Sequence, residues 1–140
     1  MKTYKPRFLF RNGDINTIYP GFFRKVNVKY TRERIELKDG DFLDIDRITK
    51  GNRKLAVLCH GLEGSSNSNY IRAAASLLSK NKYDIVAVNY RSCSGEINRL
   101  PRFYHAGATK DLGEVIEYIE KDYESIYLAG FSLGANLILK

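Results

Sequence analysis

Gly130-Phe131-Ser132-Leu133-Gly134 is the stretch of this 140-residue sequence that decides the fold. The run before it, Ser125–Ala129, is apolar, favours β-structure and has the length of a buried strand. The run after it, Ala135–Lys140, contains neither Gly nor Pro and is compatible with a helix. A serine between a strand and a helix, with glycine two residues away on each side, is the pattern of a nucleophile elbow.

The glycines of this pattern have a steric reason. The turn holds Ser132 in a strained conformation and brings strand and helix together, so side chains at Gly130 and Gly134 would clash. We therefore predict that the Ser132 hydroxyl stands clear of the sheet as a candidate nucleophile, with the N–H of Leu133 facing the same space. A tight turn that merely contains serine is the alternative interpretation, because Gly and Ser are common in turns.

Strand and helix patterns alternate through the rest of the chain. Apolar runs typical of strands buried on both faces cover 54–59 and 84–90, and helical periodicity covers 69–80 and about 107–122. This order predicts an α/β fold whose sheet is mostly parallel, with right-handed crossovers. Residues 32–48, which contain the turn signal Asp39-Gly40, predict an antiparallel hairpin ahead of it.

A glycine-bearing loop, His60-Gly61-Leu62-Glu63-Gly64-Ser65-Ser66, directly follows the first of the buried strands. When a serine attacks an acyl carbonyl, two backbone amides must stabilise the negative oxygen, each contributing about 3–4 kcal/mol. We assign these oxyanion-hole donors to Leu62 and Leu133, and count Gly61 among the glycines of the site. A phosphate-binding turn is the alternative, but the loop lacks the Gly-Lys-Ser/Thr ending of a P-loop.

The chain has two histidines, and neither is predicted to act on the serine. His60 precedes the oxyanion amide, so we expect its side chain to order the loop; service as the general base is the alternative. His105, just before the second helix, is interpreted as a capping or core residue. In this fold class the acid and the histidine of the triad follow the serine, so both are expected beyond residue 140.

The basic charge is confined to the first part of the chain. Residues 1–54 hold 14 Lys and Arg against 7 Asp and Glu, whereas residues 55–140 hold 9 of each. The aromatic, basic segment 1–31 is expected to pack across the body through its apolar side chains: Phe8, Phe10, Ile15, Ile18, Phe22 and Phe23. Nucleic acid or an anionic membrane are alternative reasons for the charge, but we favour a solvated surface and predict no nucleic-acid partner.

Two cysteines do not make a disulfide framework. Cys59 ends an apolar run and is interpreted as a small buried hydrophobe, whereas Cys93 falls in a loop, so free thiols are expected. No signal peptide or membrane-spanning run is recognisable. These features favour a cytoplasmic protein, while the oligomeric state is left open.

Taken together, these motifs resemble the YheT-like branch of the α/β-hydrolases, predicted esterases related to the α/β-hydrolase-domain lipases. The resemblance rests on the elbow, the 60–65 loop, the Asp39–Asp44 hairpin turn, the Asn16–Pro20 segment and the stretch 89–105. Ser92 departs from it, since glycine is usual there. The chain would then be the N-terminal half of a single α/β-hydrolase domain, with 1–31 as the basic arm and 32–140 as the sheet with its crossover helices.

The resemblance implies a serine hydrolase that cleaves carboxylic esters through an acyl-enzyme on Ser132. The substrate would be a small-molecule ester, lipid-like esters included, and neither a metal nor an organic cofactor is implied. Transfer of the acyl group to an alcohol uses the same serine and stays open. The other alternative is a non-catalytic relative or fragment that acts as an interaction module; the 140-residue chain alone is expected to be inactive.

Overall fold

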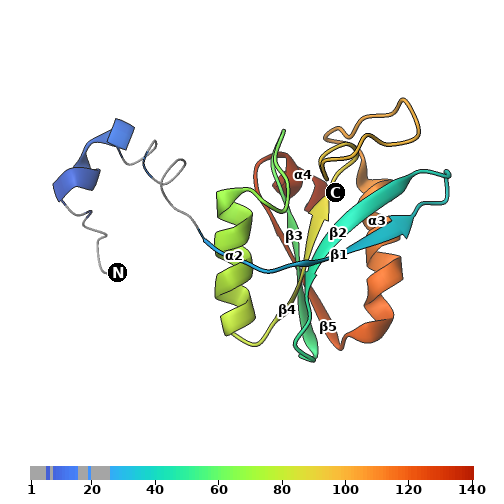
Figure 1. The fold of residues 1–140 in the computed structure, drawn as a ribbon, viewed down its shortest axis with the longest axis horizontal. Helices are drawn as coiled ribbons and strands as arrows, with labels where there is room; N and C mark the ends of the chain where they lie inside the picture. The colour runs from blue at the N-terminus through green and yellow to red at the C-terminus, as the bar shows by residue number, and fades with distance from the viewer. Residues whose placement is uncertain (1–5, 7, 16–18, 20–25) are drawn as a thin grey trace.

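A five-stranded sheet in the order β1-β2-β4-β3-β5 organises the chain (Figure 1). The computed structural model describes residues 6, 8–15, 19 and 26–140. The strands are β1 (Thr31–Glu36), β2 (Phe42–Ile48), β3 (Lys54–Cys59), β4 (Asp84–Asn89) and β5 (Ser125–Gly130). The helices are η1 (Phe8–Arg11), α2 (Asn69–Lys80), α3 (Thr109–Ile119), η2 (Glu120–Asp122) and α4 (Leu133–Ile138).

Strand direction confirms the predicted α/β fold. β3 pairs in parallel with both β4 and β5, whereas β2 pairs antiparallel with both β1 and β4, so only β2 runs against the other strands. The predicted hairpin is the β1–β2 pair. Cys59 lies opposite Gly130 in the β3–β5 ladder. The segments that follow these two strands therefore begin side by side at the carboxyl ends of the strands.

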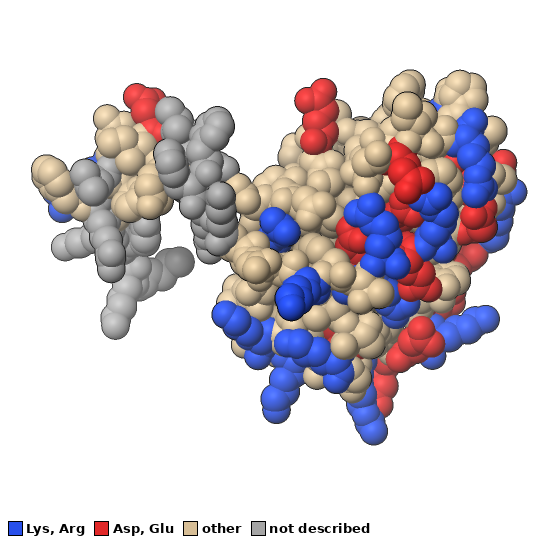
Figure 2. Space-filling view, viewed as in Figure 1, with Lys and Arg blue, Asp and Glu red and all other residues tan. Residues whose placement is uncertain are grey.

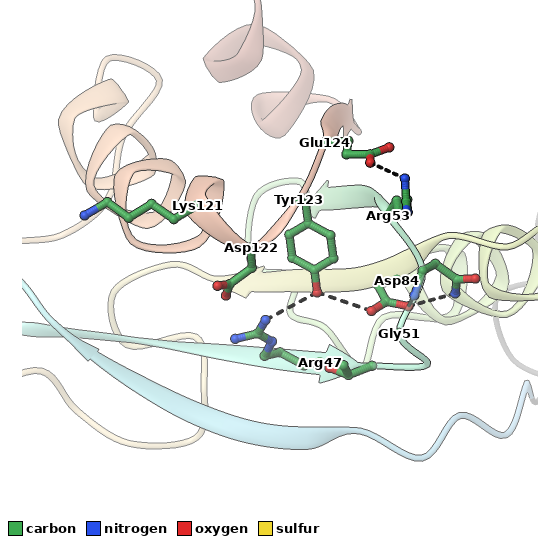
Figure 3. Close-up of a pocket in the computed structure, with 10 residues that line it drawn as sticks. Arg47, Gly51, Arg53, Asp84, Lys121, Asp122, Tyr123 and Glu124 are labelled. Carbon is green, nitrogen blue, oxygen red and sulfur yellow. Dashed lines mark hydrogen bonds and ion pairs between the residues drawn. The ribbon is translucent and has the colours of Figure 1, made fainter.

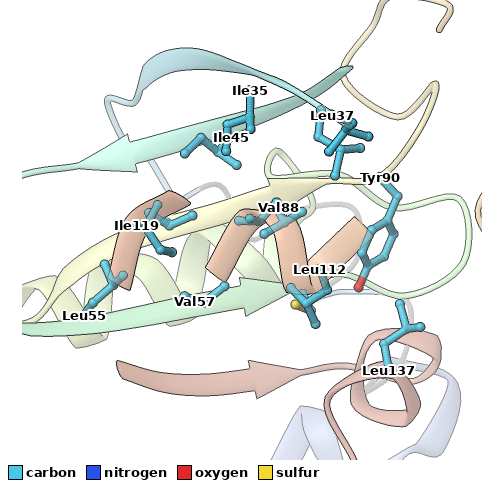
Figure 4. Packing of buried hydrophobic residues seen from close by; sticks show 14 residues of the cluster. Ile35, Leu37, Ile45, Leu55, Val57, Val88, Tyr90, Leu112, Ile119 and Leu137 are labelled. Carbon is cyan, nitrogen blue, oxygen red and sulfur yellow. The ribbon is translucent and has the colours of Figure 1, made fainter. Parts of the chain in front are cut away.

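Both faces of the sheet are covered, which explains the continuous apolar runs of β3 and β4 (Figure 1). On one face α3 and α4 pack over the larger core cluster (Figure 4), whose members include Ile45, Leu55, Val57, Val88, Leu112, Val115, Ile119 and Leu137. On the other face α2 covers a smaller cluster of Ala56, Leu58, Ile71, Ala75, Ile85 and Ala87. Cys59 is fully buried and Cys93 half-buried, both as free thiols, which confirms their interpretation.

β5 differs from the prediction of a buried strand. Its side chains are at best half-buried, and Tyr127 and Leu128 are 48% and 41% exposed. Within the described part of the chain β5 pairs only with β3, so it forms an edge of the sheet with one side unpaired.

The described part of the N-terminal segment does not support the prediction that its apolar side chains pack across the body. Phe10 is half-buried, with its ring edge-on to that of Tyr19. Phe8 is 82% exposed and Ile15 40% exposed, so the prediction that these two pack across the body is wrong. Ile18, Phe22 and Phe23, and all of the 16–20 segment except Tyr19, lie outside the described residues.

Ion pairs neutralise part of the N-terminal basic charge. The hairpin places Arg32 opposite Asp46 and Arg34 opposite Asp44, and in each pair Nε and Nη2 of the arginine donate to the two carboxylate oxygens at 2.8–2.9 Å. Figure 2 accordingly shows basic and acidic side chains interspersed over the hairpin. No helix in the described ranges is both long enough and apolar enough to span a membrane.

Candidate functional site

The elbow has the geometry that its sequence predicts. Ser132, between β5 and α4, has φ +52° and ψ −115°, a conformation that L-residues with side chains rarely adopt. The turn is held on both sides: the Phe131 N–H donates to the Cys59 carbonyl (3.0 Å), and the Asn136 N–H donates to the Ser132 carbonyl (3.1 Å). The strain at Ser132 is therefore maintained by the end of β3 and the first turn of α4.

Both elbow glycines are sterically required. A Cβ on Gly130 would lie 2.5 Å from the backbone of Gly134 and Ala135. A Cβ on Gly134 would collide with the Cys59 carbonyl and lie 2.6 Å from the His60 carbonyl oxygen. Glycine thus lets α4 cross directly over the end of β3.

Ser132 is exposed, and its hydroxyl has no hydrogen-bond partner among the described residues. The Leu133 N–H, at the first position of α4, also has none within that part of the chain, as expected for a helix N-terminus. A Cβ on Gly61 would lie 3.3 Å from the Ser132 Cβ, so the loop after β3 touches the elbow. The structure therefore brings the segment that contains Gly61 and Leu62 next to Ser132 and Leu133.

His60 is fully buried, and both of its ring nitrogens are engaged. Nδ1 lies 2.6 Å from the Gly61 carbonyl, and Nε2 accepts the Tyr90 N–H at 3.3 Å. Only a neutral ring with its proton on Nδ1 satisfies both bonds, and burial also lowers the pKa of His60. The ring orders the loop and has no free nitrogen to offer as a base.

His105 is an exposed residue of the loop before α3, so the core interpretation is wrong. Its Nδ1 accepts the Gly107 N–H at 3.1 Å, and its carbonyl accepts the Ala108 N–H at 2.9 Å. His105 thus orders the turn before α3, but the N-cap of the helix is Ala108 and no side chain caps it, so the capping interpretation is wrong as well.

A buried ionic cluster, which the sequence analysis did not foresee, anchors the segment after β4. Arg91 is 1% exposed and bonds Asp111 through Nε (2.7 Å), Asp41 through Nη1 (2.5 Å) and Asp39 through Nη2 (2.8 Å). The bond to Asp111, with burial opposing it, raises the pKa of Arg91, so the guanidinium stays charged. The hairpin turn, which holds Asp39 and Asp41, is distant in the sequence from both Arg91 and Asp111, and the only local signal was the polar character of that turn.

Two polar residues continue this anchorage. The Asn98 amide donates to Asp41 (2.9 Å) and to the Phe42 carbonyl (2.6 Å). Ser92 has φ +62°, the left-handed conformation that glycine adopts without strain. This explains physically why serine is unusual at the position where the resemblance predicts glycine.

A hollow of about 610 Å³ lies between the 60–65 loop and this anchored segment. Leu62, Phe103, Tyr104 and Cys93 contribute to its wall, and the first two are largely exposed. The hollow therefore presents apolar side chains next to the predicted oxyanion amide.

A second hollow of about 620 Å³ lies at the amino-terminal ends of β3, β4 and β5, away from Ser132 (Figure 3). At its wall Arg53 pairs with Glu124 at 2.6 Å. The Asp84 carboxylate accepts the backbone amides of Lys50 and Asn52 and thereby holds the turn between β2 and β3. Across the described ranges, no group of three or more His, Cys, Asp or Glu is arranged to hold a metal ion.

Comparison with known proteins identifies relatives of the chain. A model of the alpha/beta hydrolase fold family matches residues 55–140. The predicted esterase YheT of Escherichia coli is 35% identical over 92% of this chain and 40% of its own length. Monoacylglycerol lipase ABHD2 of Homo sapiens is 28% identical over 99% of this chain and 36% of its own length. The chain thus spans about two fifths of these curated relatives.

The fold is also that of solved esterase structures. An esterase of Pyrococcus furiosus, Pf2001, superposes with a TM-score of 0.68 at 22% identity, over 78% of this chain and 44% of that one. At this level of identity the likeness establishes the fold and not the substrate.

Proposed function

Because this chain belongs to the alpha/beta hydrolase fold family, in its YheT-like branch, we propose that the protein cleaves carboxylic esters through an acyl-enzyme on Ser132. The observation that carries the proposal is the strained, exposed Ser132, whose hydroxyl is unpaired among the described residues and which contacts the loop that offers the Leu62 amide. Strain at one exposed serine, supported by the end of β3 and the first turn of α4, is typical of a functional residue and not of an ordinary turn.

In this mechanism the Ser132 oxygen attacks the ester carbonyl and forms a tetrahedral intermediate. The N–H groups of Leu62 and Leu133 stabilise its oxyanion, each contributing about 3–4 kcal/mol. Collapse of the intermediate releases the alcohol and leaves the acyl-enzyme, which water then hydrolyses. The base that takes the Ser132 proton is a histidine, oriented by an aspartate, in the part of the protein that follows residue 140.

The substrate is a small ester with an apolar portion. The hollow beside Leu62 would accept such a group against Phe103 and Tyr104, and the relative ABHD2 is named a monoacylglycerol lipase. The same acyl-enzyme supports transfer to an alcohol when an alcohol replaces water, so the acceptor is decided by competition between the two.

The test is hydrolysis by the full-length protein of 4-nitrophenyl esters of increasing chain length and of a monoacylglycerol, with and without added ethanol. Ser132→Ala should reduce turnover at least 1,000-fold, since removal of a triad nucleophile can cost about 10⁶-fold in kcat. The matched control is Ser125→Ala, which removes a hydroxyl at the other end of β5. Turnover by Ser132→Ala within tenfold of wild type would refute the nucleophile assignment.

A further inference from the structure

We propose that Tyr70 and Tyr104 are positioning residues of the oxyanion hole. Their hydroxyls accept the N–H groups on either side of Leu62, and thereby leave the Leu62 N–H as the free donor of the loop. The proposal rests on the ester-hydrolase function proposed above, and it names the device that shapes the oxyanion site.

The hydrogen bonds of the loop single out one amide. The Gly61 N–H donates to Tyr70 Oη at 3.0 Å, and the Glu63 N–H donates to Tyr104 Oη at 2.7 Å. The next three N–H groups also donate hydrogen bonds: that of Gly64 to the Gly61 carbonyl, that of Ser65 to Ser68 Oγ, and that of Ser66 to Asn89 Oδ1. Among the described residues, Leu62 is the one member of the 61–66 stretch whose N–H has no acceptor.

The two tyrosines come from opposite sides of the loop and are themselves fixed. Tyr70, in the first turn of α2, packs its ring against Phe131 of the elbow, with centroids 4.9 Å apart. Tyr104 stacks on Tyr90 with centroids 5.3 Å apart and an interplanar angle of 28°. The Tyr70 hydroxyl therefore holds the loop to α2, next to the elbow. The Tyr104 hydroxyl holds it to the segment that the Arg91 cluster anchors.

The hydrogen bonds from the loop to Tyr70 and Tyr104 also help to hold strained backbone in the loop. Glu63 has φ +54°, and its N–H bond to Tyr104 is one of the contacts that hold it there. A Cβ on Gly64 would lie 2.6 Å from Tyr70 Oη and 3.0 Å from His60 Nδ1, so only glycine lets the loop close under the Tyr70 hydroxyl. The loop has thus a single supported conformation, with the Leu62 amide at its exposed tip.

We assign both hydroxyls to positioning, because the bond that each makes to the loop is to a backbone N–H of Gly61 or Glu63. Removing one leaves Gly61 or Glu63 with an unpaired N–H that competes for new partners, and the Leu62 amide loses its fixed direction. Oxyanion stabilisation acts in the transition state more than on bound substrate, so the loss should appear in kcat and hardly in KM.

The test uses Tyr70→Phe and Tyr104→Phe in the full-length protein, with Tyr118→Phe as the matched control. Tyr118 also loses a hydroxyl hydrogen bond, to Glu33 Oε1, but in α3 away from the loop. The measurements are kcat and KM for a short 4-nitrophenyl ester, the melting temperature, and inhibition by a trifluoromethyl ketone, whose serine adduct places an oxyanion in the hole.

Each loop variant should lower kcat about tenfold and raise the inhibition constant of the ketone by a similar factor, with KM changed less than twofold; this is part of the 100- to 1,000-fold loss expected for a whole donor. Tyr118→Phe should change none of these. Unchanged kcat and inhibition in both loop variants, with Ser132→Ala inactive, would overturn the positioning role alone. Full activity of Ser132→Ala would overturn the proposed function and this inference with it.

Discussion

Gly134→Ala tests how closely α4 must approach β3. The added Cβ would collide with the Cys59 carbonyl and lie 2.6 Å from the His60 carbonyl oxygen, whereas ordinary contacts begin at 3.4 Å, so the two backbones must separate by at least about 0.8 Å. β3 is buried between β4 and β5, and α4 is therefore the element that must move. Overpacking of this kind costs about 1–3 kcal/mol, of which alanine's helix propensity returns at most about 1 kcal/mol.

We expect Gly134→Ala to lower the free energy of unfolding of the full-length protein by about 1–2 kcal/mol. It should also slow fluorophosphonate labelling, because the Leu133 N–H moves together with α4. Urea unfolding followed by circular dichroism measures the first effect, and a timed labelling gel measures the second.

Gly113→Ala is the matched control. Gly113 lies on the exposed face of α3, and a Cβ there has nothing within 4 Å. This variant should gain about 0.5–1 kcal/mol and label at the wild-type rate. If Gly134→Ala were as stable as wild type, or if Gly113→Ala lost as much stability, the argument from close approach would fail.

Three further predictions concern buried groups and the isolated chain. Burial raises the pKa of Asp41, but hydrogen bonds and the Arg91 contact outweigh burial and lower this pKa to about 2 from 3.8. Between these values the unfolded state binds more protons than the folded state, so the urea midpoint of unfolding should fall as the pH drops from about 4 towards 2. The fall should be less steep in Asp41→Asn. Cys59→Ala should lower stability by about 1 kcal/mol and spare ester hydrolysis; lost activity at unchanged stability would contradict this. Residues 1–140 made alone should not label with a fluorophosphonate, because His60 has no free ring nitrogen; stoichiometric labelling would show that a base lies within the chain.

Local patterns were enough to predict most of the fold. The helix predicted over 69–80 is α2 itself, and the strand patterns match β3 and β4 to within one residue. Such elements are encoded by apolar periodicity and turn residues, which are read within a few neighbouring positions. The elbow could also be predicted locally, because this turn brings two backbones so close that it requires glycine at positions 130 and 134.

The features that sequence reasoning missed depend on contacts between distant residues. Arg91 meets its carboxylate partners across 20 to 52 positions, and Tyr104 meets the Glu63 amide across 41. A lone buried arginine or a tyrosine hydroxyl leaves no periodic signal, so neither could be distinguished from a surface residue. The apolar run of β5 does not by itself give its exposure, because such a run looks the same at a sheet edge as at its centre.

The central claim is that Ser132 is the nucleophile, and covalent labelling tests it most directly. Full-length protein is treated with a fluorophosphonate, digested, and the modified peptide is sequenced by mass spectrometry. The account predicts one equivalent of label on Ser132, and none on the folded Ser132→Ala variant with an unchanged melting temperature. Label on another residue, or equal labelling of Ser132→Ala, would contradict it.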